Sequence, residues 1–410
     1  MSSRPLKTVA YGSLTVLIAM MMAGTFVERF HGADTAARVI YHHPVFFVLW
    51  AVTAVSALVW LLQRVGTKRP ATLLLHAALV LILAGALITH LSGLSGSIHL
   101  REGEPTGALV LDDGTSVELP FLLELKAFRI EYDPGTTHVA DYVSELVFLS
   151  RGDSGSTAGM TVISMNHIAK RDGYRFYQAD YDEDGRGSIL AVSRDPWGVG
   201  VTYTAYLLLL LAMAGYFFEK GSYREALLAA LRRGKTPARG RKPWILALSA
   251  AGVAILVVWF LGAFPKGPLL PVLRSPLLLV HMIPIMVSYA LFGLTTILGV
   301  VGLLLPAEKS ARLMSVSWLI LLPAAFLLAF GTFLGGVWAN ISWGNYWAWD
   351  PKETWALVTL LVYSFALHGA ATGSLRTPKA FHAFCIVAFL CVLVTYFGVN
   401  LLLGGMHSYA

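Results

Sequence analysis

Long apolar stretches separated by short polar segments run through most of the chain. An α-helix needs about 20 residues to cross the hydrocarbon core of a bilayer, and each stretch is near that length. We place nine of them, at 8–27, 45–63, 71–91, 199–218, 243–263, 276–305, 313–335, 353–371 and 380–404. The fold class predicted from this pattern is an all-α polytopic membrane protein of about nine transmembrane helices.

The pattern changes between the third and fourth stretches, where short runs of alternating residues replace the long apolar ones. "ALVLDDGTSVELP" is typical of a hairpin that turns at Asp-Gly, and five further runs follow it, separated by Gly, Asp and Pro. They are "FLLELKAFRIEY", "DYVSELVFLS", "MTVISMNHIA", "YRFYQADY" and "GSILAVS". We therefore expect a small outer β-rich domain inserted between the third and fourth helices. It contains no catalytic motif, and a docking or scaffolding role is expected.

Composition and charge support a membrane protein. The chain is 56% hydrophobic and 13% charged, with a mean hydropathy of +0.65, whereas soluble domains carry about 25% charged residues. Eight Lys or Arg lie in the segment 219–242, and three further basic loops fall on the same side if the stretches alternate. Such loops face the cytoplasm, so we expect the N-terminus inside and the C-terminus outside. The net charge of +7 then reflects topology, and no nucleic-acid partner is expected.

The expected organisation has four parts. Residues 1–91 form three helices, 92–198 the extracytoplasmic β-rich domain, 199–242 the fourth helix and the basic cytoplasmic loop, and 243–410 a five-helix domain. The first stretch lacks a convincing cleavage site and is expected to be retained. The only two cysteines, Cys385 and Cys391, lie in the last stretch and off each other's helical face, which favours packing over redox chemistry or zinc binding.

Four of the twelve histidines form two pairs when they are sorted by depth. His76 and His368 both lie near the cytoplasmic ends of their helices. His281, near the outer end of its helix, and His407, after the last helix, both lie on the outer side. Ionisable groups within membrane spans are usually functional, but a lone histidine there is more often a satisfied hydrogen-bonding residue.

Depth alone leaves other pairings open. His382 competes for the inner pair and His90 for the outer one, because each lies at a matching helix end. Neutral imidazoles suit zinc, copper or haem iron, and with no Cys or carboxylate beside them a tetrahedral zinc site is disfavoured. Two imidazoles from separate helices fit the axial ligands of a b-type haem.

A second candidate is the aromatic segment "ISWGNYWAWDPKETWAL", within 337–355. An aromatic belt at headgroup level is one interpretation, and Asp350, Pro351 and Glu353 match a helix N-cap, N1 and N3. Neither explains why three indoles crowd into seven residues beside a glycine. A planar ligand such as haem is the alternative, and the pattern leaves both open. The residues expected to line such a ligand are Trp343, Gly344, Trp347, Trp349 and Asp350.

Three segments together resemble a known family. "WGNYWAWDPKETWAL" is similar to the tryptophan-rich signature of haem-handling proteins in cytochrome c maturation. "SPLLLVHMIPIMVSYALF" and "VNLLLGGMHSYA" resemble the histidine segments that flank it in the System II cytochrome c synthase. "HAALVLILAGALITHLSGLSGSIHLREGE" resembles the partner protein of that system, so the chain looks like a fusion of both halves. Its outer domain, about 100 residues, is smaller than in the larger fusions.

The resemblance implies an activity and its partners. Haem b (iron protoporphyrin IX) would be ligated first by His76 and His368, then by His281 and His407 beside the indoles, and attached through thioethers to Cys-x-x-Cys-His of apocytochrome c. Such a haem lyase (holocytochrome c synthase) would act at the outer face of a bacterial cytoplasmic membrane, with separate thiol-reducing proteins. A haem transporter without attachment activity and a bis-histidine di-haem electron-transfer cytochrome are the alternative hypotheses.

Overall fold

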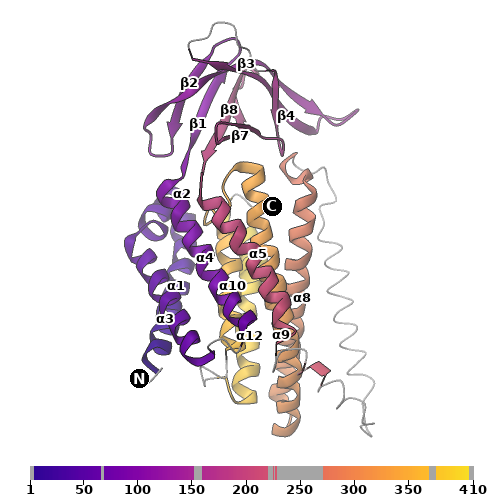
Figure 1. Cartoon of the computed structure of the whole chain (residues 1–410). Helices are drawn as coiled ribbons and strands as arrows, with labels where there is room; N and C mark the ends of the chain where they lie inside the picture. Colours follow the sequence, from indigo (N-terminus) through magenta and orange to yellow (C-terminus); the bar gives the residue numbers. More distant parts are fainter. Residues whose placement is uncertain are drawn as a thin grey trace.

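The computed structural model describes residues 4–65, 69–151, 159–219, 225, 227–228, 271–368 and 375–405. Helices form an elongated bundle, and a twisted sheet covers one end of it (Figure 1). The sheet is built from the residues between helices α4 and α5. The helical elements, in chain order, are α1 Arg4–His31, α2 Ala33–Ala36, η1 Ala37–Tyr41, α3 Pro44–Val65, α4 Pro70–Ser92, α5 Gly198–Tyr216, η3 Pro271–Arg274, α8 Pro276–Leu304, α9 Ala307–Trp343, α10 Pro351–Leu367, α12 Pro378–Leu393 and η4 Val394–Leu403.

Seven helical segments in the described residues are long and apolar enough to cross a membrane. They correspond to the first four, the sixth, the seventh and the ninth predicted stretches. The eighth stretch forms α10, a helix of 17 residues, and the fifth, 243–263, lies outside the described residues. The chain is therefore a polytopic membrane protein, while the number of nine spans stays a prediction.

Proline marks where many of these helices begin. The first residue of α3, α4, α8, α10 and α12 is a proline, a position where its missing N–H costs nothing and its fixed φ suits the helix. The end of α9 is set differently: it runs beyond the predicted 313–335 as far as Trp343, and Gly344 then adopts φ +84°. A glycine in this left-handed conformation commonly ends a helix. The extension of α9 carries its last turns up to the sheet.

All eight strands form one antiparallel sheet in the order β5-β4-β3-β2-β1-β8-β7-β6. The predicted hairpin joins β2 to β3 and turns at Gly114, φ +85°. Two boundaries differ from expectation, because β3 runs unbroken through Pro120 into the next predicted run and "MTVISMNHIA" divides into β5 and β6. The strands are β1 Leu94–Arg101, β2 Thr106–Leu111, β3 Ser116–Tyr132, β4 Val139–Ser150, β5 Thr161–Ser164, β6 Ala169–Arg171, β7 Tyr174–Tyr181 and β8 Gly187–Arg194.

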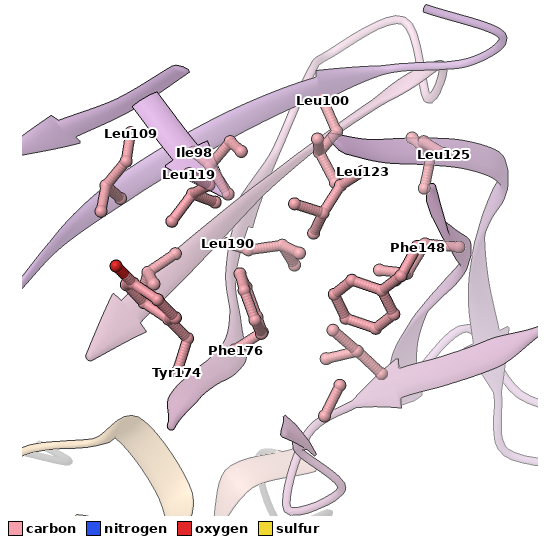
Figure 2. Close-up of a cluster of buried hydrophobic side chains, with 14 of the residues drawn as sticks. Ile98, Leu100, Leu109, Leu119, Leu123, Leu125, Phe148, Tyr174, Phe176 and Leu190 are labelled. Atoms are coloured by element: carbon pink, nitrogen blue, oxygen red, sulfur yellow. The ribbon is translucent and has the colours of Figure 1, made fainter. Parts of the chain in front are cut away.

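The sheet has its own apolar core (Figure 2). Side chains alternate along a strand, so Leu119, Phe121, Leu123 and Leu125 of β3 all point to one side, and each is at most 2% exposed. They meet Phe176 of β7 in this core. The sheet thus has an apolar core that is separate from those of the helices.

Polar contacts fix the sheet to the helices below it. Arg274, just before α8, donates two hydrogen bonds to the Asp133 carboxylate, at 2.9 and 2.6 Å. Arg175 of β7 donates to the side-chain oxygen of Asn340 in α9 at 3.1 Å, and the Tyr177 hydroxyl donates to the Asn340 carbonyl at 3.1 Å. The sheet therefore contacts α9, which leads into the tryptophan-rich segment. It also contacts the turn before α8, the helix that carries His281.

Candidate functional site

The structure brings together the two histidines of the predicted inner pair. His76 lies in the second turn of α4 and His368 caps the C-terminus of α10. Their ring centres are 5.9 Å apart, with the rings nearly perpendicular at 84°. Two imidazoles on opposite sides of one metal ion, each bonded at about 2.0–2.1 Å, have ring centres about 6 Å apart. The spacing therefore suits ligation of a shared metal.

Backbone carbonyls fix the tautomer of both rings. Nδ1 of His76 lies 2.8 Å from the Thr72 carbonyl oxygen, and Nδ1 of His368 lies 2.7 Å from that of Ser364. Because a carbonyl only accepts, each Nδ1 carries the proton and donates. Each neutral ring then keeps a lone pair on Nε2, the arrangement by which outer-shell contacts prepare a histidine for metal binding.

A further contact holds the helix turn that orients His76. The Glu219 carboxylate accepts from the Thr72 N–H at 2.9 Å and from the Thr72 hydroxyl at 2.6 Å. Thr72 is the residue whose carbonyl receives the His76 proton. This link could not be predicted from the sequence, because Glu219 follows α5 and is separated from Thr72 by all eight strands of the sheet.

His382, the competitor for the inner pair, occupies a different environment. It is fully buried, its Nε2 lies 3.1 Å from the Ser310 carbonyl, and its ring packs against Gly302, where an added Cβ would come within 2.3 Å of Nε2. These contacts belong to the packing of α12 against α8 and α9, which fits a structural histidine.

His281 lies one and a half turns into α8 and packs against α9. Its ring stacks on Trp338 with centres 5.2 Å apart and an angle of 23°. Trp338, 1% exposed, contacts Trp343 edge to face at 4.9 Å. The approach is close because α9 presents Gly331 and Gly335 to α8: an added Cβ would come 2.9 Å from the His281 carbonyl oxygen at Gly331 and 3.2 Å from the His281 ring at Gly335. Trp338 is a site residue that the sequence did not single out, although 331, 335 and 338 share one helix face.

The predicted partner of His281, His407, lies outside the described residues. The described chain ends at Gly405, which lies against Asp350 and Pro351: an added Cβ at Gly405 would come within 2.6 Å of the Asp350 carboxylate and 2.9 Å of the Pro351 ring. The last described residue therefore contacts the tryptophan-rich segment.

The space expected beside Gly344 is filled. An added Cβ there would come within 2.6 Å of the Tyr177 ring from β7. The glycine ends α9 and receives the sheet, which replaces the expectation of open room for a ligand at that point. Trp347, three residues on, has a buried Nε1–H without a hydrogen-bond partner in the described residues. A ligand that accepts a hydrogen bond, as a carboxylate does, fits this indole.

Trp349 is held by the N-terminal part of the chain. Its indole lies parallel to the Tyr41 ring, 4.8 Å away at 4°, and meets Phe46 edge to face at 5.1 Å. Its φ of +60° is unusual for a bulky residue and costs about 1–3 kcal/mol, a kind of strain that clusters at functional sites. The aromatic contacts across the bundle help to keep it in this conformation.

Asp350 has the predicted capping role. It is the N-cap of α10 and accepts from the Lys352 N–H at 2.9 Å, with Pro351 at N1. Glu353 differs from a capping box, because its carboxylate accepts from the Ala348 N–H at 2.9 Å. The two carboxylates therefore fix the bend between the indoles and α10.

Comparison with known proteins gives a family for each half of the chain. Residues 62–218 match the ResB-like family, and residues 226–407 match the family described as "Cytochrome C assembly protein". A membrane protein of cytochrome c assembly is thus the class that the fold and the matches define. The chain belongs to the cytochrome c assembly family, as a fusion of the System II cytochrome c synthase type.

Several curated relatives are similar to part of the chain. NrfI of Wolinella succinogenes is 41% identical over 152 residues, 35% of this chain and 17% of the relative. CcsA of Chlamydomonas reinhardtii is 38% identical over 153 residues, 35% of this chain and 43% of the relative. CcsA of Prochlorococcus marinus is 30% identical over 256 residues, 50% of this chain and 80% of the relative. The chain thus spans less than half of the first two relatives but most of the third.

Proposed function

We propose that the chain moves haem b across a bacterial cytoplasmic membrane and attaches it to apocytochrome c. Membership of the cytochrome c assembly family supports a role in cytochrome c maturation. The contact between His76 and His368 carries the proposal for the chain itself. In it, His76 and His368 ligate haem iron near the cytoplasmic side, and His281 and His407 ligate it near the outer face.

The donor sets support this assignment. At the inner pair both Nδ1–H groups are engaged by carbonyls, so two Nε2 lone pairs are left for axial ligation. At the outer pair His281 packs beside Trp338, and Gly405, two residues before His407, lies against Asp350. In the proposal Trp343 and Trp347 border the porphyrin, the Trp347 Nε1–H donates to a propionate, and Trp349 and Asp350 hold the segment's shape.

The attachment reaction is an addition. Each thiol of the Cys-x-x-Cys-His segment adds across one haem vinyl, so that a C–S bond forms while the thiol proton passes to the other vinyl carbon, without net oxidation or reduction. The histidine of that segment replaces one axial imidazole, which lets the product leave. The protein supplies proximity and orientation, and the vinyl chemistry is that of haem. Reduced thiols come from the substrate and from separate thiol-reducing proteins.

The basic segment 219–242 supports an orientation with the N-terminus in the cytoplasm. In this orientation the sheet and the tryptophan-rich segment lie on the extracytoplasmic face. Lipid surrounds the helices. Apocytochrome c reaches the site from the side on which the sheet lies.

Co-expression tests the attachment step. The chain is produced with an apocytochrome c in a bacterium that lacks its own maturation system, and covalent haem is measured by pyridine haemochrome and by haem staining after denaturation. Covalent product supports the synthase. Haem bound to the protein without covalent product would instead support a transporter or an electron-transfer cytochrome.

Single substitutions test the ligands. We expect His76→Ala and His368→Ala to lower haem occupancy and remove the low-spin bis-imidazole spectrum of the inner site, and His281→Ala and His407→Ala to do the same for the outer site. His138→Ala, in an exposed hairpin of the outer domain, is the control. A loss confined to a folded His382→Ala variant would transfer the inner role to His382.

A further inference from the structure

A third pair of imidazoles lies at the outer end of the bundle, and the proposed function does not use it. His42 follows η1 directly, and His90 lies in the last turn of α4. Their ring centres are 5.2 Å apart at an angle of 46°, and the Phe47 ring packs on His90 at 4.9 Å. His90 is 14 residues beyond His76 on the same helix, about 21 Å along its axis, so this pair is separate from the inner one.

Both imidazoles are exposed and available as ligands. Within the described ranges neither side chain makes a hydrogen bond to the protein, in contrast to His43, whose Nδ1 accepts from the Val45 N–H at 3.2 Å. Imidazole binds a metal in its neutral form, through the lone pair of a ring nitrogen.

The spacing points to neighbouring positions around one ion. Two imidazoles bonded at about 2.0–2.1 Å have ring centres about 4.5–5 Å apart at neighbouring positions, and about 6 Å apart on opposite sides of the metal. The observed 5.2 Å is closer to the first arrangement, whereas the inner pair fits the second. We propose that His42 and His90 bind a divalent transition-metal ion of the copper and nickel class. No group of three or more His, Cys, Asp or Glu suited to a metal occurs in the described residues, so water completes the coordination.

An ion bound by His42 and His90 would link two parts of the chain that both contact the tryptophan-rich segment. Tyr41, the residue before His42, stacks on Trp349. Thr89, the residue before His90, accepts a hydrogen bond from the Tyr346 hydroxyl at 2.8 Å. A bound ion therefore joins two points that contact the tryptophan-rich segment from different helices. It stabilises the folded state by mass action and restrains the outer end of α3 and α4.

Copper binding to the full chain tests the proposal. Protein without a histidine tag, purified in detergent micelles, is titrated with Cu²⁺, and bound copper is followed by electron paramagnetic resonance. We expect His42→Ala and His90→Ala each to lose one equivalent of tightly bound Cu²⁺ and its two-nitrogen hyperfine pattern. His43→Ala and His138→Ala are the matched controls and keep both. Because His42 and His90 are exposed, the variants should keep the unfolding midpoint of wild type in EDTA.

Three outcomes would overturn the proposal. The first is equal copper stoichiometry and spectra in wild type and both variants. The second is a loss caused by His43→Ala instead. The third is a loss of haem absorption in His42→Ala or His90→Ala with copper binding intact, which would make the pair a haem ligand. The first two outcomes leave the haem-ligand variants of the inner and outer pairs unaffected. In the third, those variants still show whether their own histidines bind haem, so the two proposals fail separately.

Discussion

At the scale of single residues, the candidate site depends on contacts that hold the proposed ligand side chains in one orientation. The carbonyls of Thr72 and Ser364 fix the tautomers of His76 and His368, and Tyr41 fixes Trp349. These supporting residues come from other elements than the groups they orient, or from the preceding helix turn. Substituting them should therefore change stability or spectra without removing a ligand.

Tyr41 provides the first prediction. Its ring is 2% exposed and covers one face of Trp349, so Tyr41→Ala should lower the free energy of unfolding by about 3–5 kcal/mol. The Tyr41 hydroxyl donates a hydrogen bond to the Met21 carbonyl at 3.4 Å. Tyr41→Phe keeps the stacked ring and removes this bond, so it should cost about 1 kcal/mol. Thermal unfolding in detergent measures both. Equal losses in the two variants would mean that the hydroxyl, and not the stack, matters.

Asp350 separates a capping role from a role in haem binding. Asp350→Asn keeps an oxygen that accepts from the Lys352 N–H, so stability should stay near wild type, whereas Asp350→Ala should lose about 1 kcal/mol. Haem absorption is recorded on the same samples. A haem spectrum that changes in Asp350→Asn at unchanged stability would show that the charge acts on haem, beyond the cap.

At the scale of elements, the close packing of α8 on α9 positions His281. Gly331 lets the α8 backbone approach, because an added Cβ would lie 2.9 Å from the His281 carbonyl oxygen. Small residues at such crossings allow helices in membranes to pack closely. The ring stack of His281 on Trp338 then depends on the distance between two helix axes.

Gly331→Ala should push α8 from α9 and lower stability by about 1–3 kcal/mol, with a shift in the haem spectrum of the outer site. Gly12→Ala in α1 is the control, since nothing lies within 4 Å of its added Cβ and alanine favours a helix over glycine by about 1 kcal/mol. Unfolding midpoints and absorption spectra of both variants provide the measurement. An unchanged unfolding midpoint and absorption spectrum in Gly331→Ala would show that the interface between α8 and α9 adjusts to the added methyl group.

At the scale of the whole molecule, the sheet and the helices are joined by the ion pair of Arg274 and Asp133. The hydrogen bonds from Arg274 lower the pKa of the Asp133 carboxyl below its usual value. A carboxyl whose pKa is lower in the folded state stabilises it above the unfolded pKa, about 3.9, and this contribution is lost as the pH falls through the folded pKa. Contact between the sheet and η3 should therefore weaken below about pH 4.

Limited proteolysis of the hairpin around Asp133, as a function of pH, measures that contact. Asp133→Asn should be cleaved faster than wild type at pH 7 and should show less acceleration on acidification. Asp113→Asn is the control, because the pKa of Asp113 is lowered by Thr115 within its own turn and involves no helix. Identical pH profiles for wild type and Asp133→Asn would exclude the ion pair as the link.

The sequence predicted more of the fold than of the candidate site. Apolar length and alternation predicted the long helices that are described and most strands, since a bilayer and a half-buried sheet each impose their own period. The short helices α2, η1 and η3 were not predicted. The motif and the depth of His76 and His368 indicated the site. The stack of Tyr41 on Trp349 joins residues 308 positions apart. The contact of Trp338 with His281 and the pair of His42 with His90 join residues 57 and 48 positions apart.

The sequence by itself determined what is set locally: which segments are apolar enough to enter lipid, where prolines start helices, and that histidines lie at two depths. Only the tertiary structure decided which rings meet, because side chains from separate helices come together through packing that no local period encodes. In the structure the Tyr177 ring lies against Gly344, and His382 packs between α12, α8 and α9, away from the inner pair. The tertiary structure also placed two exposed imidazoles in contact at the outer end of α3 and α4.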